Sequence, residues 1–204
     1  MAGRRGFVIG NGESLNQTPL EEIAERYDTF AVNRIHKLYG QRPFRPRFYV
    51  RVEPHGGDEQ PDEFRDECRL HVGLGEQCLF PKIWGTEWLG QHENVEYRNT
   101  CRHFSRNRVP SGWHLPMICD YGGAVQAAIQ WAVAKGYDEI VLVGCDLTGG
   151  HFTKDYKGAI TPDLWIKAHE LAKRESPVPI INATIGGMLE VHPREDVWSY
   201  LSSR

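Results

Sequence analysis

The sequence predicts a single α/β domain over residues 1–204, with a mostly parallel sheet and helices on both faces. Strand-like and helix-like segments alternate along most of the chain. The run DEIVLVGCD at 138–146 is continuously apolar and ends in an acid, which is typical of a central parallel strand. No repeat or linker divides the chain, and its length suits one domain with a sizeable core.

The first fifty residues predict a strand, a helix and two more strands. Residues 6–10 form a short apolar run that indicates a buried strand. Thr18 and Glu21 have the spacing of a capping box, which predicts that a helix begins here. Two further strands are predicted at 29–33 and 47–53.

The middle of the chain is less regular. Residues 62–71 predict a short helix, and residues 78–84 predict a strand. Residues 98–120 predict a long irregular loop, which in a compact domain is usually functional or mobile. The last third is regular again, with a helix at 123–135, the central strand at 138–146, a short lid loop at about 147–160, a helix at 161–175, a strand at 179–184 and a terminal helix at 196–201.

Composition excludes several classes of protein. The net charge of -3 gives no bulk attraction to nucleic acid, so no nucleic-acid partner is expected. No run reaches the roughly 18 apolar residues of a membrane helix, and no signal peptide or integral membrane segment is expected. The five cysteines are odd in number and include no CxxC pair, which argues against a disulfide framework or a zinc knuckle. A cytoplasmic location is expected.

The stretch FVIGNGESL at 7–15 places a glycine turn directly after the first predicted strand. Gly10 and Gly12 allow close backbone approach, backbone N–H groups of such a turn can cradle an anion, and Asn11 and Ser14 add polar contacts. The third glycine of a dinucleotide fingerprint and the lysine of a P-loop are both missing. The pattern predicts a looser nucleotide turn than that of NAD-binding proteins. The alternative is a tight strand-to-loop turn without a ligand.

Other candidate residues lie at predicted strand ends. Asn33 ends the second strand, where it can bind a base or ribose, or cap the next turn. Asp146 ends the central strand, and the loop after it carries His151, whose ring suits proton transfer near neutral pH. A surface histidine in a glycine-rich loop is the alternative. Four arginines flank the third strand and either attract an anionic substrate or form a solvated edge: Arg42, Arg45, Arg47 and Arg51.

Five motifs occur in a fixed order along the chain: GNGESL at 10–15, AVNRI at 31–35, RVPSG at 108–112, GYDEIVLVGCDL at 136–147, and IKAHELAKRE at 166–175 followed by PIINAT. This set resembles the bacterial sialyltransferases of glycosyltransferase family 42 and the wider DUF115 group. That group includes 6-hydroxymethylpterin pyrophosphokinase-like proteins. The resemblance spans most of the chain and does not single out one activity.

The resemblance implies a Rossmann-like domain, a GT-A-like variant with a reduced lid, that binds a cytidine nucleotide. The segment corresponding to the family's SG motif is either RVPSG or the YGG at 121–123. The nucleotide-binding residues predicted on this basis and from the glycine turn are Gly10, Asn11, Gly12, Ser14, Asn33, Arg108, Ser111, Gly112, Gly122, Gly123 and Thr148.

The implied reaction is a metal-independent transfer of a sugar from a CMP-sugar to an acceptor hydroxyl, so no metal ligand and no cofactor is expected. The candidate catalytic residues are His151 as general base, Tyr156 beside the departing phosphate, and Asp146. His169 is a second candidate for the base, because the family's lid is longer than the corresponding loop here.

Two alternatives stay open. One is a Mg-ATP-dependent pyrophosphokinase of the 6-hydroxymethylpterin type, with Asp146 and Asp155 as metal ligands. The other is a nucleotide-binding module without catalysis. The partners expected for the glycosyltransferase are a nucleotide-sugar and a glycan or small-molecule acceptor, and homo-oligomerisation is compatible with the sequence.

Overall fold

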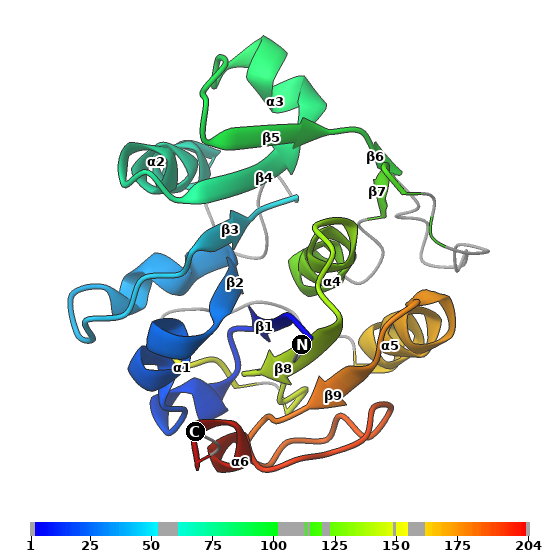
Figure 1. The fold of residues 1–204 in the computed structure, drawn as a ribbon. Coiled ribbons are helices and arrows are strands. Elements are labelled where there is room, and N and C mark those ends of the chain that lie inside the picture. The colour runs from blue at the N-terminus through cyan, green and yellow to red at the C-terminus, as the bar shows by residue number, and fades with distance from the viewer. Residues whose placement is uncertain are drawn as a thin grey trace.

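The protein is described by a computed structural model that covers residues 3–52, 61–101, 113, 115–119, 123–148, 150–154 and 162–202. The main sheet consists of β1 (Arg5–Ile9), β2 (Asp28–Val32), β3 (Phe48–Val50), β4 (Gln77–Pro81), β5 (Val95–Arg98), β8 (Glu139–Val143) and β9 (Ile180–Asn182). Their order across the sheet is β5-β4-β3-β2-β1-β8-β9, and each neighbouring pair is parallel (Figure 1). The predicted α/β fold with a mostly parallel sheet is confirmed.

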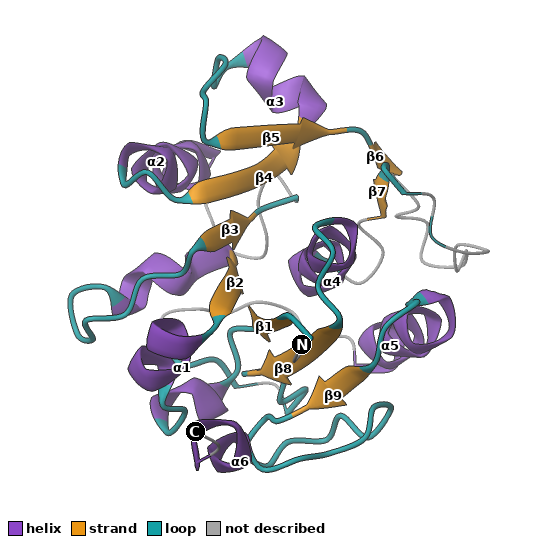
Figure 2. Cartoon of the chain, in the orientation of Figure 1, coloured by secondary structure: helices purple, strands orange, loops and turns teal. Residues whose placement is uncertain are grey.

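Helices cover both faces of this sheet (Figure 2). One face carries α1 (Leu20–Arg26), α2 (Pro61–Gly73), α6 (Val197–Ser202) and two 3-10 segments, η1 (Glu13–Asn16) and η2 (Asn33–Leu38). The other face carries α4 (Ala124–Ala134) and α5 (Pro162–Glu175). The short helix α3 (Lys82–Glu87) follows β4, and a separate parallel pair consists of β6 (Thr100–Cys101) and β7 (Ile118–Cys119).

Side chains of the central strands alternate between two apolar cores, because successive residues of a strand point to opposite faces. In β1, Val8 packs in the α4 core, whereas Phe7 and Ile9 pack on the α1 side. In β8, Leu142 packs in the α4 core, whereas Val143 packs on the α1 side. Burial on both faces explains why these strands are continuously apolar in sequence.

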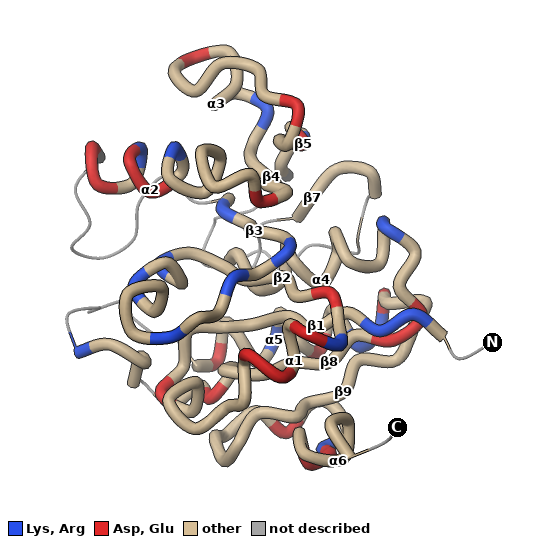
Figure 3. Tube along the Cα trace, turned by 60° about the vertical axis from the view of Figure 1, so that its left-hand side comes forward, with Lys and Arg blue, Asp and Glu red and all other residues tan. Residues whose placement is uncertain are grey.

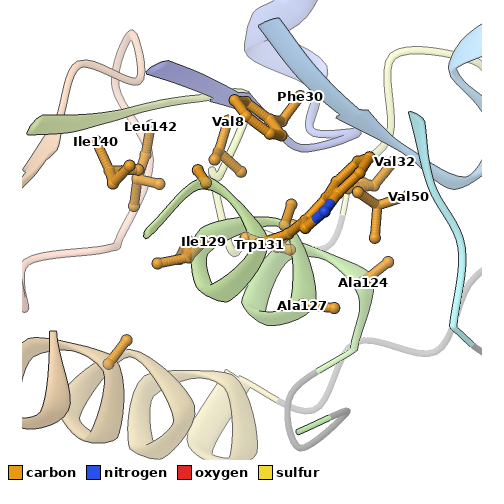
Figure 4. Packing of buried hydrophobic residues seen from close by; sticks show 14 of the residues in the cluster. Val8, Phe30, Val32, Val50, Ala124, Ala127, Ile129, Trp131, Ile140 and Leu142 are labelled. Atoms are coloured by element: carbon orange, nitrogen blue, oxygen red, sulfur yellow. The ribbon is translucent and has the colours of Figure 1, made fainter. Parts of the chain in front are cut away.

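Helix α4 supplies the largest buried side chain of its core (Figure 4). Trp131 is 1% exposed and meets the ring of Phe30 edge-on, with 5.8 Å between ring centroids. Its indole N–H donates to Glu96 Oε2 at 3.0 Å, so the polar atom of this buried ring has a partner. Ala127 and Ala128 are fully buried, which lets the helix lie close to the sheet.

The strand order reverses beside β1. The chain moves from β1 through β2 to β5 in one direction, and later returns to place β8 and β9 on the other side of β1. In open parallel sheets, ligands bind in the crevice outside the carboxyl ends of the two strands at such a point. The residues that follow β1 and β8 are therefore the first place to look for a site.

Several local predictions need correction. Thr18 does not cap α1, because its hydroxyl donates to the Ser14 carbonyl oxygen at 2.9 Å, and Glu21 instead pairs with Arg42. The segment predicted as an irregular loop at 98–120 contains the end of β5 and the β6–β7 pair, while 102–112 lie outside the described residues. Within the described part of the chain, no helix is long and apolar enough to cross a membrane.

Candidate functional site

The turn after β1 packs tightly against the residues that follow β8. The Gly10 N–H donates to the Val143 carbonyl oxygen at 2.9 Å, and the Gly12 N–H donates to the Gly144 carbonyl oxygen at 2.8 Å. A Cβ atom at Gly10 would lie 2.4 Å from the Gly144 oxygen, and one at Gly12 would lie 1.5 Å from Asp146 Oδ2. Both positions therefore require glycine because two backbone segments approach each other closely.

Asp146 fills the inside of this turn. Asp146 is only 4% exposed. Its Oδ2 accepts a hydrogen bond from the backbone N–H of Ser14 at 3.2 Å. Burial raises the pKa of Asp146, against the opposing effect of Ser14, whose backbone N–H donates to the carboxylate. The carboxylate thus occupies the place at the start of η1 where a glycine turn would hold a phosphate.

This arrangement bears on the prediction that the turn's backbone amides cradle an anion. The N–H groups of Gly10, Gly12 and Ser14 all donate to acceptors within the protein. In this conformation, none of these three amides is available to a phosphate. Gly10 and Gly12 serve close packing between the β1 and β8 loops, and groups other than these three amides are candidates for ligand recognition.

Two asparagine side chains at neighbouring strand ends provide such groups. Asn11 is 8% exposed, and its Nδ2 donates to the Val32 carbonyl oxygen at 3.2 Å, at the end of β2. Asn33 follows directly, with a φ of 49° that asparagine tolerates better than most residues. Within the described residues, the buried Oδ1 atoms of Asn11 and Asn33 accept no hydrogen bond. A buried acceptor without a donor costs about 1–3 kcal/mol, so both oxygens favour a ligand that donates.

The loop after β8 folds back onto the β1 turn and brings His151 to it. Residues Gly12 and His151 form an antiparallel bridge, and the Phe152 N–H donates to the Asn11 carbonyl oxygen at 3.1 Å. His151 Nδ1 lies 3.2 Å from the same oxygen. Because a carbonyl only accepts, Nδ1 carries the proton, and in the neutral ring the lone pair lies on Nε2. Thr148 is exposed in the same loop.

The structure thus brings Asn11, Gly12, Ser14, Asp146 and His151 together at the ends of β1 and β8. Gly123 lies at the start of α4 with a φ of 83°, and Figure 4 shows the next residue, Ala124, toward Val50. His169, the second candidate base, is buried in α5 against His192. The remaining predicted site residues lie outside the described part of the chain: Arg108, Ser111, Gly112, Gly122 and Tyr156. Asp155, the second metal ligand of the pyrophosphokinase alternative, lies outside it as well.

The four arginines around β3 do not form one patch. Figure 3 shows Lys and Arg residues distributed over several elements and interleaved with Asp and Glu on α2. Arg45 packs over the ring of Tyr39, 4.1 Å from its centroid. The other three each pair with a carboxylate: Arg42 with Glu21, Arg47 with Asp28 and Arg51 with Glu67.

Gly187 is a residue of the site that sequence reasoning missed. It has a φ of 79°, and a Cβ atom there would lie 2.8 Å from both Cα and the carbonyl oxygen of Asp146. The Met188 N–H donates to the same oxygen at 2.7 Å. The only local signal is the GG pair at 186–187, since the contact joins segments far apart in the sequence.

Gly187→Ala is expected to lower the free energy of unfolding by about 2–3 kcal/mol, from the strained backbone and from the overlap with Asp146. Gly186→Ala is the matched control. Its φ is 67°, but no atom lies within 4 Å of the added Cβ, so we expect only about 1 kcal/mol. Urea unfolding of both variants measures the difference. Equal losses would show that the contact with Asp146 contributes nothing.

Fold and site together define a Rossmann-like α/β domain with polar groups at the switch point beside β1. No family model and no curated protein matches the sequence. Among solved structures, the MAf glycosyltransferase from Magnetospirillum magneticum AMB-1 is similar over 100% of this chain, with a TM-score of 0.62 and 17% identity. The chain spans 35% of the length of that protein, and at this identity the likeness concerns the fold alone.

Two sialyltransferase structures are more distant. CST-II in complex with a trisaccharide acceptor and CMP aligns with 88% of this chain and 80% of its own, at a TM-score of 0.42 and 13% identity. CstII from Campylobacter jejuni in complex with CMP-3FNeuAc also aligns over 88% of this chain and 80% of its own length, at a TM-score of 0.40 and 12% identity. At these values the two structures carry no argument about this chain.

Proposed function

We propose that the domain binds a cytidine nucleotide at the carboxyl ends of β1, β2 and β8, and transfers a sugar from a CMP-sugar to an acceptor hydroxyl. The observation that carries this proposal is the pair of buried oxygens, Asn11 Oδ1 and Asn33 Oδ1, that accept no hydrogen bond within the described residues. Cytosine presents an exocyclic amino group, which is a donor, where uracil presents an acceptor. Ribose hydroxyls can satisfy the second oxygen. Acceptors at these strand ends therefore favour cytidine over uridine.

His151, which lies against the β1 turn, is proposed as the general base. The acceptor hydroxyl attacks the anomeric carbon, the bond from this carbon to the phosphate oxygen breaks, and CMP leaves with the bonding electrons. The hydroxyl proton passes to Nε2 of His151, while Nδ1–H stays bonded to the Asn11 carbonyl oxygen. Tyr156 and Thr148 are proposed to stabilise the departing phosphate, and Arg108 with Ser111 to contact the nucleotide or the sugar.

Fold likeness adds a second line of support. The MAf protein that shares this fold is by its name a glycosyltransferase. Unrelated functions occur on one fold, so this likeness raises the expectation without deciding the chemistry. The enclosed position of Asp146, with Oδ2 accepting the Ser14 N–H, favours a structural role for this carboxylate over the metal-binding role that the pyrophosphokinase alternative requires.

Nucleotide binding provides the first test. CMP at one hundred times its Kd should stabilise the protein by about 2.7 kcal/mol, and UMP should do so less at the same concentration. Asn11→Ala and Asn33→Ala should each weaken CMP binding about tenfold, because each removes one acceptor. The exposed Asn99 supplies the control variant, Asn99→Ala, which should bind like the wild type. Calorimetry with CMP, UMP and ATP, each with and without Mg²⁺, would contradict the proposal if only Mg-ATP bound.

Turnover provides the second test. His151→Ala should lower kcat for CMP release from a CMP-sugar by about 10²–10⁴-fold, while the Kd for CMP changes little. The measurement is CMP release with and without EDTA, paired with calorimetric CMP binding to each variant. Unchanged turnover in His151→Ala would remove this residue from the mechanism. CMP binding without any turnover in the wild type would favour the non-catalytic module.

A further inference from the structure

A cluster of buried polar side chains lies between η2 and α2, away from the glycine turn. Both helical segments pack on the same face of the sheet (Figure 1). His36 comes from η2, and Glu67 and His71 come from one face of α2, four residues apart. One ring nitrogen of each histidine and one Glu67 oxygen lie within 4.8 Å of one another. Across the described ranges of the chain, this is the one group of three His, Cys, Asp or Glu residues close enough to hold a metal ion.

His71 is oriented as a metal ligand would be. It is 0% exposed, and Nδ1 lies 2.6 Å from Glu76 Oε2. Glu76 is held in turn by the Tyr39 hydroxyl, which donates to Oε1 at 2.9 Å. Nδ1 therefore carries the proton, and Nε2 keeps its lone pair. Nε2 is buried and has no hydrogen-bond partner among the described residues. A carboxylate behind a histidine fixes the tautomer in this way at many metal sites.

Glu67 keeps one acceptor site for a further partner. The Tyr49 hydroxyl donates to Oε1 at 2.7 Å, and Arg51 Nη1 lies 3.1 Å from both carboxylate oxygens. A carboxylate offers about four lone-pair positions, so about one on Oε2 is left.

The local charge admits a cation. Arg51 balances one of the two carboxylates, Glu67 and Glu76. A divalent ion that enters the cluster meets three nitrogen and oxygen ligands, and the two carboxylates beside it face a single guanidinium.

We propose that His36, Glu67 and His71 form a divalent transition-metal site, with zinc as the metal that this ligand set fits best. Two imidazoles and a carboxylate, with water in the fourth position, are a familiar zinc ligand set. Tetrahedral ligands at about 2.0–2.1 Å from zinc lie about 3.3 Å apart, so ligand atoms that lie within 4.8 Å of one another must close by up to about 1.5 Å. The His36 side chain is 24% exposed, which gives the ion a route and the ligand room to move.

Metal binding would join η2 to α2. Asn33 and His36 lie in the same short segment, three residues apart, so the ion would also fix the segment that carries Asn33 at the end of β2. The sequence predicts no metal site, because the ligands come from two elements separated by β3 and a long connection. The inference goes beyond the proposed function and does not depend on it.

The test uses the full chain, stripped with EDTA and then titrated with Zn²⁺ or Co²⁺. We expect one ion per chain, a higher Tm with Zn²⁺, and visible Co²⁺ absorption of the four-coordinate type. His36→Ala and His71→Ala should each weaken binding at least tenfold. Glu76→Gln should weaken it about 10–100-fold, as for a residue that positions a ligand. The exposed His92 supplies the control, His92→Ala, which should bind like the wild type.

His36 decides the outcome if His71→Ala fails to fold, because His36 lies at the margin of the cluster and its loss leaves the stacked Tyr49–His71 rings in place. Zinc affinity unchanged in His36→Ala would overturn the proposal. So would Co²⁺ spectra with strong thiolate bands, which would place the metal on cysteines, or six-coordinate spectra typical of a surface-bound ion.

Discussion

Gly12→Ala is expected to lower the free energy of unfolding by about 4 kcal/mol or more and to abolish nucleotide binding. The new Cβ atom would lie 1.5 Å from Asp146 Oδ2, 2.5 Å from Asp146 Cγ and 2.7 Å from the Gly144 carbonyl oxygen. Relief of this overlap requires the buried carboxylate to leave the Ser14 N–H and the β1 turn to move away from β8. Overpacking costs about 1–3 kcal/mol, and the loss of hydrogen bonds to a buried charge adds a similar amount.

Urea unfolding and calorimetric CMP binding check this expectation. Gly40→Ala is the matched control, because no atom lies within 4 Å of the Cβ that it adds, and we expect a change within about 0.5 kcal/mol. A double variant, Gly12→Ala with Asp146→Gly, removes the two clashing Asp146 atoms, leaves the Gly144 oxygen in place, and should recover part of the loss. A Gly12→Ala protein with the urea midpoint of the wild type would show that the turn is looser than described.

Sequence patterns predicted those parts of the fold that depend on local burial. β1 and β8 were predictable because both of their faces are buried, which makes each strand apolar without interruption. β5 was missed because its residues, VEYR, are half-buried and pair on one side only, at the edge of the sheet. The capping box at Thr18 failed because the preceding 3-10 turn offers its hydroxyl a nearer acceptor, the Ser14 carbonyl oxygen.

The strand-end positions of the candidate residues were predictable, but the contacts that they make were not. Gly10, Gly12, Asn33 and Asp146 all stand at strand ends, and parallel strands bring such ends to one edge. The sequence could not reveal that Asp146 would take the Ser14 N–H, because that contact joins residues of two different crossover units. The same holds for the approach of Gly187 to Asp146 and for the cluster at His71.

Acid is expected to destabilise the protein through a buried pair of histidines. His169 and His192 are 1% and 3% exposed, and His169 Nδ1 lies 3.0 Å from His192 Nε2. Burial lowers the pKa of His169 to about 3, with a further contribution from His192. Burial also lowers the pKa of His192 to about 4, with a further contribution from Lys173. Both rings are therefore neutral in the folded state at pH 5, where the unfolded chain is protonated.

Acid lowers the free energy of unfolding because the unfolded chain binds protons that the folded state does not. Both folded pKa values lie below the unfolded value of about 6.5. The stability that the neutral histidine pair contributes is therefore complete above about pH 6.5 and is lost as the pH falls toward 4. Between pH 7.5 and pH 5.0 each histidine accounts for about 2 kcal/mol, so the pair accounts for about 4 kcal/mol. Urea unfolding at the two pH values measures this loss.

Other groups titrate in the same range, so the pair must be isolated by difference. Asp146 acts in the opposite direction, since its raised pKa means that the folded state binds a proton more readily than the unfolded chain. The double variant His169→Gln with His192→Gln keeps a donor and an acceptor at the contact but removes both titrating rings. Between pH 7.5 and 5.0 its free energy of unfolding should fall by about 4 kcal/mol less than that of the wild type. The exposed His92, changed to Gln, should leave the pH dependence as it is. If the double variant kept the full wild-type pH dependence, the loss in acid would have to come from other residues.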